Sequence, residues 1–129
     1  MIVCGLWAAR RHLVAVLVGD RGEPRRTVRA AGTDDARFGL LEYLAHAGAE
    51  LVATAALAQA DPLLAQAARR GIAVWILDDQ LAAALLAAAG IRDPVRAAAL
   101  LARLRIVPAW RAHLRPLTPA MPARQLPLL

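Results

Sequence analysis

The first 31 residues, MIVCGLWAARRHLVAVLVGDRGEPRRTVRAA, decide the fold class of this chain. Residues 1–8 are a short apolar run, and residues 12–18 (HLVAVLV) are a second run rich in valine and leucine. Both have the length and composition of buried strands. Residues 25–30 alternate polar and apolar side chains, as a half-exposed edge strand does. Because GDRG at 19–22 is a turn sequence, the three runs predict an antiparallel meander.

Helical and strand patterns alternate after the meander. Residues 50–56 and 72–77 are apolar enough to be inner strands of a sheet. Each predicted helix begins after an N-capping residue. It ends at a glycine or at the last apolar position of its helical pattern. Their capping residues are Thr33, Asp61, Asp78 or Asp79, and Asp93. The order βββαβαβα predicts an α/β fold with a five-stranded mixed sheet, helices on its faces and right-handed crossovers in its parallel part.

The chain has 129 residues, enough for one domain with a real core. We expect that domain to span residues 1–104. Residues 105–129 hold most of the prolines and show little periodicity, which predicts an arm with a short helix around 110–114.

The charge is unevenly distributed. The net charge is +6, and residues 91–129 carry this whole excess, with seven arginines and one acid. A local basic segment is what contact with a nucleic-acid backbone needs, although a solvated arginine-rich tail has the same composition. The residues that we expect to contact DNA or RNA are Arg103, Arg105, Trp110, Arg111 and Arg115. Trp110 suits base stacking, or else packing of the arm onto the domain.

Two segments at the N-terminal end resemble the RuvC-like domain of DEDD-type insertion-sequence transposases. That domain has a strand G-I-D-V-S-K followed by a strand H-L-D-V-A-V, where this chain has GLWAAR at 5–10 and HLVAV at 12–16. The order of predicted elements is also the ribonuclease H-like order.

The resemblance continues through residue 117. The family has E-A-T-G-x-Y, then A-G-I-P-V, where this chain has VATAA at 52–56 and RGIAV at 70–74. Its T-D-x-x-D-A-x-x-L-A segment resembles RDPVRAAALL at 92–101, and IVP at 106–108 closes the match. The resemblance implies a ribonuclease H-like fold and an ancestral two-metal phosphodiester-cleaving site.

The residues at the family's four catalytic positions have changed. Two-metal cleavage needs several carboxylates around two Mg²⁺ ions about 4 Å apart. The Asp, Glu, Asp and Asp of the family fall here on Trp7, Thr54, Asp93 and Arg96. One acid of the four remains, and the guanidinium of Arg96 repels a cation. We therefore expect no catalytic residues, no metal and no cofactor, and a module that binds nucleic acid or a protein partner.

A small nuclease is the alternative function. Short Holliday-junction resolvase-like proteins have a D-E-R-L-T-T segment that resembles DDQL at 78–81. Asp78, Asp79 and Asp93 would then be the ligands of Mg²⁺. Each of the three also stands where a helix N-cap is predicted, which explains an aspartate without a metal.

The remaining features point away from other kinds of site. The single cysteine, Cys4, excludes an intramolecular disulfide and is expected inside a buried strand. The three histidines, at 12, 46 and 113, share no ligand spacing.

No apolar run is long enough to cross a membrane, and the N-terminus lacks the charge order of a secretory signal, so we expect a cytoplasmic protein. The alanine-rich stretch 82–89 is either buried or an interface, and we expect a homodimer.

Overall fold

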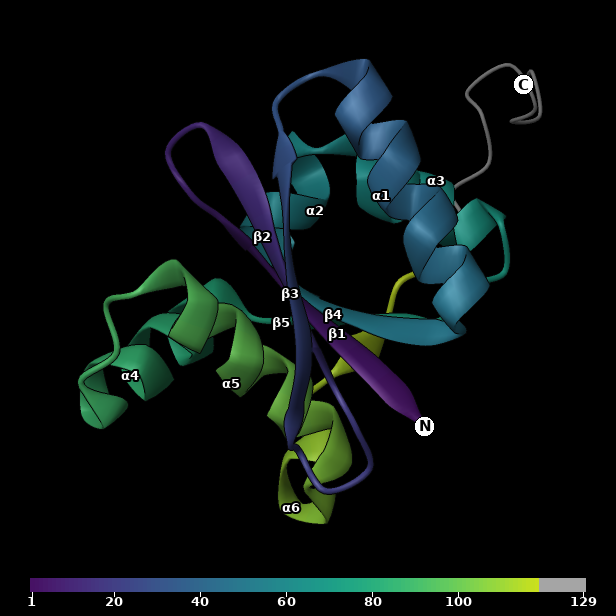
Figure 1. Cartoon of the computed structure of the whole chain (residues 1–129). Helices are drawn as coiled ribbons and strands as arrows, with labels where there is room; N and C mark the ends of the chain where they lie inside the picture. The colour runs from purple at the N-terminus through teal and green to yellow at the C-terminus, as the bar shows by residue number, and fades with distance from the viewer. Residues whose placement is uncertain (119–129) are drawn as a thin grey trace, which may run out of the picture.

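The computed structural model describes residues 1–118 of the chain. These residues form a six-stranded mixed sheet in the order β3-β2-β1-β4-β5-β6, with helices on both of its faces (Figure 1). The strands are β1 (Ile2–Ala8), β2 (His12–Val18), β3 (Pro24–Ala31), β4 (Ala49–Thr54), β5 (Val74–Leu77) and β6 (Arg115–Pro116). The helices are α1 (Asp34–Ala47), α2 (Ala55–Ala60), α3 (Pro62–Arg69), α4 (Asp79–Ala89), α5 (Pro94–Ile106) and α6 (Pro108–Arg111).

The meander and the parallel section are confirmed. β1 pairs antiparallel with β2, and β2 pairs antiparallel with β3. β4 lies parallel to β1 on its other side, and β5 lies parallel to β4. β1 is therefore a central strand, and its carboxyl end lies beside that of β4.

Successive side chains of each strand point to opposite faces of the sheet, and they form two hydrophobic cores, one on each face. In β1, Cys4 and Leu6 face the cluster formed with α1, α2 and α3, and Val3 faces the cluster formed with α4 and α5. Figure 1 views the sheet along its edge, with α1 and α3 on one side and α4 and α5 on the other. Complete burial raises the pKa of the Cys4 thiol far above its ordinary value, and the thiol donates to the Gly5 carbonyl at 3.6 Å, so it stays protonated and unreactive.

Glycine in β1 lets α5 lie unusually close to the sheet. Gly5 is flanked by Val16 of β2 and Val52 of β4, and the backbone of α5 crosses directly above it at Ala98 and Ala102. A Cβ atom at Gly5 would lie 1.8 Å from the Ala98 carbonyl oxygen. The small side chains of the α5 alanines and the missing side chain of Gly5 thus allow α5 and β1 to pack closely.

Two elements were not expected from the sequence. The sheet has six strands instead of five, because Arg115–Pro116 pairs with β5. Leu114 is buried just before this short strand, and the Leu117 amide donates to the Val74 carbonyl just after it. The buried Leu114 side chain and these backbone hydrogen bonds hold residues 115–116 to the sheet. The sequence shows no strand pattern in this segment.

The second unexpected element is α2. The sequence predicts one strand through residue 56, but β4 ends at Thr54, whose hydroxyl caps α2 by accepting from the Leu57 amide. Alanine and leucine are strong helix formers, so an apolar run alone does not distinguish the strand from the helix that follows it.

The segment assigned to an arm begins inside α5, which continues to Ile106, two residues past the predicted boundary. The short helix expected around Trp110 is α6, at Pro108–Arg111. Residues 119–129 of the predicted arm, with Arg124, lie outside the described residues. Within the part of the chain that the structure describes, no helix is long and apolar enough to cross a membrane.

Candidate functional site

The structure brings two of the four family positions together at the carboxyl edge of the sheet. Gly5 of β1 is in register with Val52 of β4, so Trp7 and Thr54 stand side by side two residues further along these parallel strands. Both side chains are half-buried. The resemblance therefore pointed to two residues that are neighbours in space, although they are far apart in the chain.

Trp7 and Thr54 line an apolar groove of about 610 Å³ between α2 and α4. Its walls are the end of β1 and β4, one face of α2 and one face of α4. The lining residues are Leu6, Trp7, Ala8, Thr54, Ala56, Leu57, Ala60, Asp79, Ala82, Ala83 and Leu86. Asp79 is the single carboxylate among them. In open α/β sheets this edge, outside the carboxyl ends of the strands, is where ligands bind.

The polar groups of the groove are occupied by backbone amides. Asp79 Oδ1 accepts from the Ala56 amide at 3.0 Å, which joins the first turn of α4 to the first turn of α2. Thr54 Oγ1 accepts from the Leu57 amide at 3.4 Å. These contacts fix the two walls of the groove relative to each other.

Asp93 and Arg96, the other two family positions, do not line the groove. Asp93 caps α5, where its Oδ2 accepts from the Arg96 amide at 3.3 Å. Asp78 caps α4 in the same way, by accepting from the amides of Gln80 and Leu81. The capping role that the sequence predicts for these two aspartates is confirmed.

The residues present do not fit a two-metal centre. Within residues 1–118, no group of three or more His, Cys, Asp or Glu side chains gathers at a point where it could hold a metal ion. At the edge of the sheet stand the indole of Trp7 and the hydroxyl of Thr54, and neither balances the charge of two divalent cations. We therefore derive no catalytic step through a metal.

A second, smaller hollow of about 280 Å³ adjoins the groove and shares Ala8, Leu57 and Ala60 with it. Its charged lining comes from the β1–β2 hairpin, with Arg10 and Arg11, and from Arg37 and Asp61. The exposed arginines of the hairpin give this end of the edge a positive charge.

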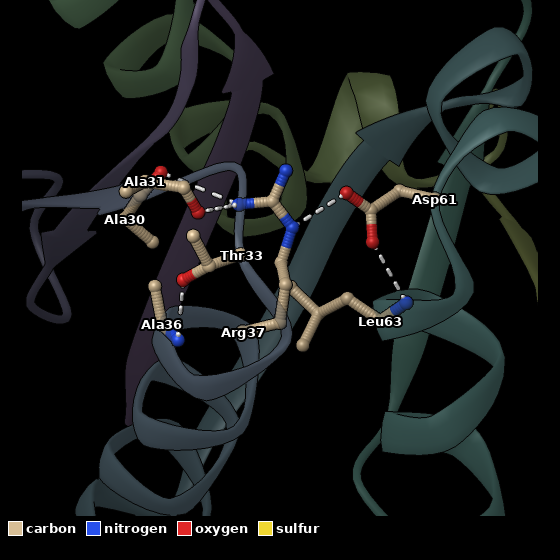
Figure 2. A network of polar contacts seen from close by, with 7 residues as sticks. All are labelled: Ala30, Ala31, Thr33, Ala36, Arg37, Asp61 and Leu63. Atoms are coloured by element: carbon tan, nitrogen blue, oxygen red, sulfur yellow. Dashed lines mark hydrogen bonds and ion pairs between the residues drawn. The ribbon is translucent and has the colours of Figure 1, made fainter.

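Arg37 and Asp61 join three elements behind the second hollow (Figure 2). Arg37 Nε donates to Asp61 Oδ2 at 2.8 Å, and its Nη1 donates to the carbonyls of Ala30 and Ala31 at the end of β3. Asp61 Oδ1 accepts from the Leu63 amide at the start of α3. Sequence reasoning identified Asp61 as a helix cap but missed Arg37, because nothing in the sequence links residues that are 24 positions apart.

The five residues expected to contact nucleic acid do not form one surface. Arg105 is half-buried: its Nε donates to Glu50 Oε1 at 2.9 Å, and its guanidinium lies 4.5 Å from the centre of the Trp75 ring. The Trp75 indole also donates to Glu50, at 2.8 Å. Arg105 therefore ties the last turn of α5 to the middle of the sheet.

The other four candidates lie at three different places. Trp110 packs against the core on the α5 face, and Arg111 donates to the carbonyls of Arg105 and Ile106 at the end of α5. Arg103 is exposed and donates to the Gly22 carbonyl in the β2–β3 turn. Arg115 is exposed on β6, at the opposite edge of the sheet from β3.

We compared the sequence with models of known protein families and with curated proteins. Neither comparison finds a match.

Proposed function

We propose that this chain is a catalytically inactive ribonuclease H-like domain, of the RuvC-like type found in DEDD-type transposases, that binds nucleic acid without cutting it. The antiparallel meander followed by parallel strands supports the fold assignment. Trp7 and Thr54 at the ends of β1 and β4 support the loss of cleavage, because they stand where the family has metal-binding carboxylates.

The observation that carries nucleic-acid binding is a row of three arginines on the α5 face of the sheet. Arg96 and Arg103 are separated by about two helical turns, so they lie along one side of α5. The bond from Arg103 to Gly22 shows that this side faces the β2–β3 hairpin. Arg29 of β3 is in register with Val14, whose side chain is in the core under α5, so Arg29 leaves the sheet on the same face.

The three side chains are available to phosphates. Arg29, Arg96 and Arg103 are exposed, and within residues 1–118 none of them takes part in an ion pair. Arginine binds phosphate oxygens in a bidentate fashion and supplies affinity that does not depend on base sequence. The row therefore replaces the C-terminal segment as the main expected contact, with Arg103 common to both.

Fluorescence anisotropy of a labelled DNA duplex and of a labelled RNA tests the proposal. The matched pair of variants is R29Q/R96Q on the row and R26Q/R69Q away from it, which remove the same charge from exposed positions. We expect R29Q/R96Q to weaken binding by about tenfold at low salt and to lower the salt dependence by about two counterions. R26Q/R69Q should stay close to the parent chain. Equal losses in both variants, or no binding by the parent, would refute the proposal.

Repeating the assay with Mg²⁺ and with EDTA distinguishes the inactive domain from the alternative, a small metal-dependent nuclease. The inactive domain binds equally in both and leaves the labelled strand intact on a denaturing gel. Cleavage that EDTA stops, and that D93N also removes, would favour the nuclease that uses Asp78, Asp79 and Asp93.

A homodimer through α4 is part of the proposal. Ala84, Ala87 and Ala88 are exposed on this helix, and it carries no charge after Asp79. An exposed apolar helix face is typical of a subunit interface. Sedimentation velocity over a range of concentrations should show a dimer that A84E/A88E converts to a monomer, and a parent chain that is monomeric throughout would exclude the dimer.

A further inference from the structure

We propose that the groove at the carboxyl ends of β1 and β4 binds a small amphipathic anion, with its apolar body between α2 and α4 and its anionic group at Arg10 and Arg11. This ligand site is separate from the arginine row on α5 and does not depend on the proposed function.

The size and lining of the groove suit an apolar body. Its volume of about 610 Å³ lies within the range of roughly 300–1,000 Å³ that small-molecule sites occupy. Leu6 and Leu57 form its floor on the α2 side, and the half-buried Trp7 indole forms a flat wall on the α4 side. Ala56, Ala60 and Ala83 are exposed along its rims, so apolar surface faces solvent in the described structure.

The charged residues at the two ends of the groove determine which charge the ligand carries and in which orientation it binds. Arg10 and Arg11 line the hollow that continues from the groove past Ala8, and among the described residues neither has an ion-pair partner. Arg37, in the same hollow, is already neutralised by Asp61 at 2.8 Å. Asp79 stands in the wall formed by α4 and repels an anionic group there. The anionic group therefore lies at the hairpin, and the body that extends toward α4 is uncharged.

Laurate, a single carboxylate on an aliphatic chain, and 1-anilinonaphthalene-8-sulfonate, a single sulfonate on an aromatic body, carry this chemistry. Sulfonate binding is measured by its fluorescence and laurate binding by displacement of the sulfonate. Dodecanol and dodecylammonium have a similar apolar body without the negative charge. We expect laurate to displace the sulfonate at a concentration at least about tenfold lower than either analogue does, because a charge-assisted hydrogen bond to arginine is lost in both.

Two pairs of variants locate the ligand. R10Q/R11Q removes the cationic end, and R25Q/R26Q removes the same charge from exposed positions of β3. A83W fills the groove from an exposed position on its rim, and A109W adds the same indole at an exposed position of α6, outside the groove. We expect R10Q/R11Q to weaken sulfonate and laurate binding by about tenfold and A83W to abolish it. R25Q/R26Q, A109W and the nucleic-acid variant R29Q/R96Q should bind as the parent chain does.

Several results would overturn the proposal. Sulfonate binding that survives in A83W would place the probe elsewhere, and binding that R10Q/R11Q leaves unchanged would remove the anionic selectivity. Binding that weakens as the protein concentration rises would show that a second copy of the chain occupies the groove instead. Circular dichroism of each variant confirms that a loss of binding is not a loss of fold.

Discussion

Replacing Gly5 with alanine is expected to destabilise the domain by at least about 4 kcal/mol. The new methyl group would lie 1.8 Å from the Ala98 carbonyl oxygen and 2.9 Å from the Ala102 nitrogen, both backbone atoms of α5. Because backbone atoms cannot rotate away as a side chain does, the whole helix must move off the sheet. That movement opens the core that Val14, Val16 and Val52 form beneath α5.

Gly39→Ala is the matched control for this prediction. Gly39 lies on the exposed side of α1, and no atom stands within 4 Å of the added methyl group. The same chemical change should here stabilise the protein by about 0.5–1 kcal/mol, since alanine is the better helix former. Urea unfolding followed by circular dichroism measures both variants. Equal midpoints for G5A and the parent chain would mean that α5 does not pack on β1 in this way.

Removing the Asp61 carboxylate is expected to cost about 3 kcal/mol of stability in Asp61→Ala. The variant loses the ion pair with Arg37 and the cap on the Leu63 amide together, and it leaves the largely buried guanidinium of Arg37 without its counter-charge. The side chains of Arg37 and Asp61 are only 20% and 10% exposed, so water replaces little of what is lost.

Glu42→Ala removes an ion pair of similar length from the surface. Glu42 and Arg70 are 48% and 40% exposed, and their 2.9 Å contact should contribute no more than about 1 kcal/mol. Thermal unfolding of D61A, R37A and the double variant gives the coupling energy between Arg37 and Asp61. A coupling energy no larger than that of Glu42 with Arg70 would show that the network in Figure 2 does not join β3, α1 and α3.

The candidate site was predictable only in part. The family resemblance selected Trp7 and Thr54, which the structure places side by side, because parallel neighbouring strands end at the same edge of a sheet. The groove around them was not predicted, because its walls come from α2, which has no clear signal in the sequence, and from one face of α4. In the sequence Arg10 and Arg11 only separate two apolar runs, and their place beside the groove depends on how the hairpin projects from the sheet.

The α/β class, the antiparallel meander, the parallel section and the helix starts all follow from local patterns in the sequence. Thr33, Asp61, Asp78 and Asp93 all cap helices as predicted, because a cap acts on amides two or three residues away. The tertiary structure alone decided that Gly5 lies under α5, that Glu50 accepts from an arginine 55 positions later, and that residues 115–116 complete the sheet. Hydrophobic periodicity and capping are local signals, whereas the partner of a buried side chain depends on which segments pack together.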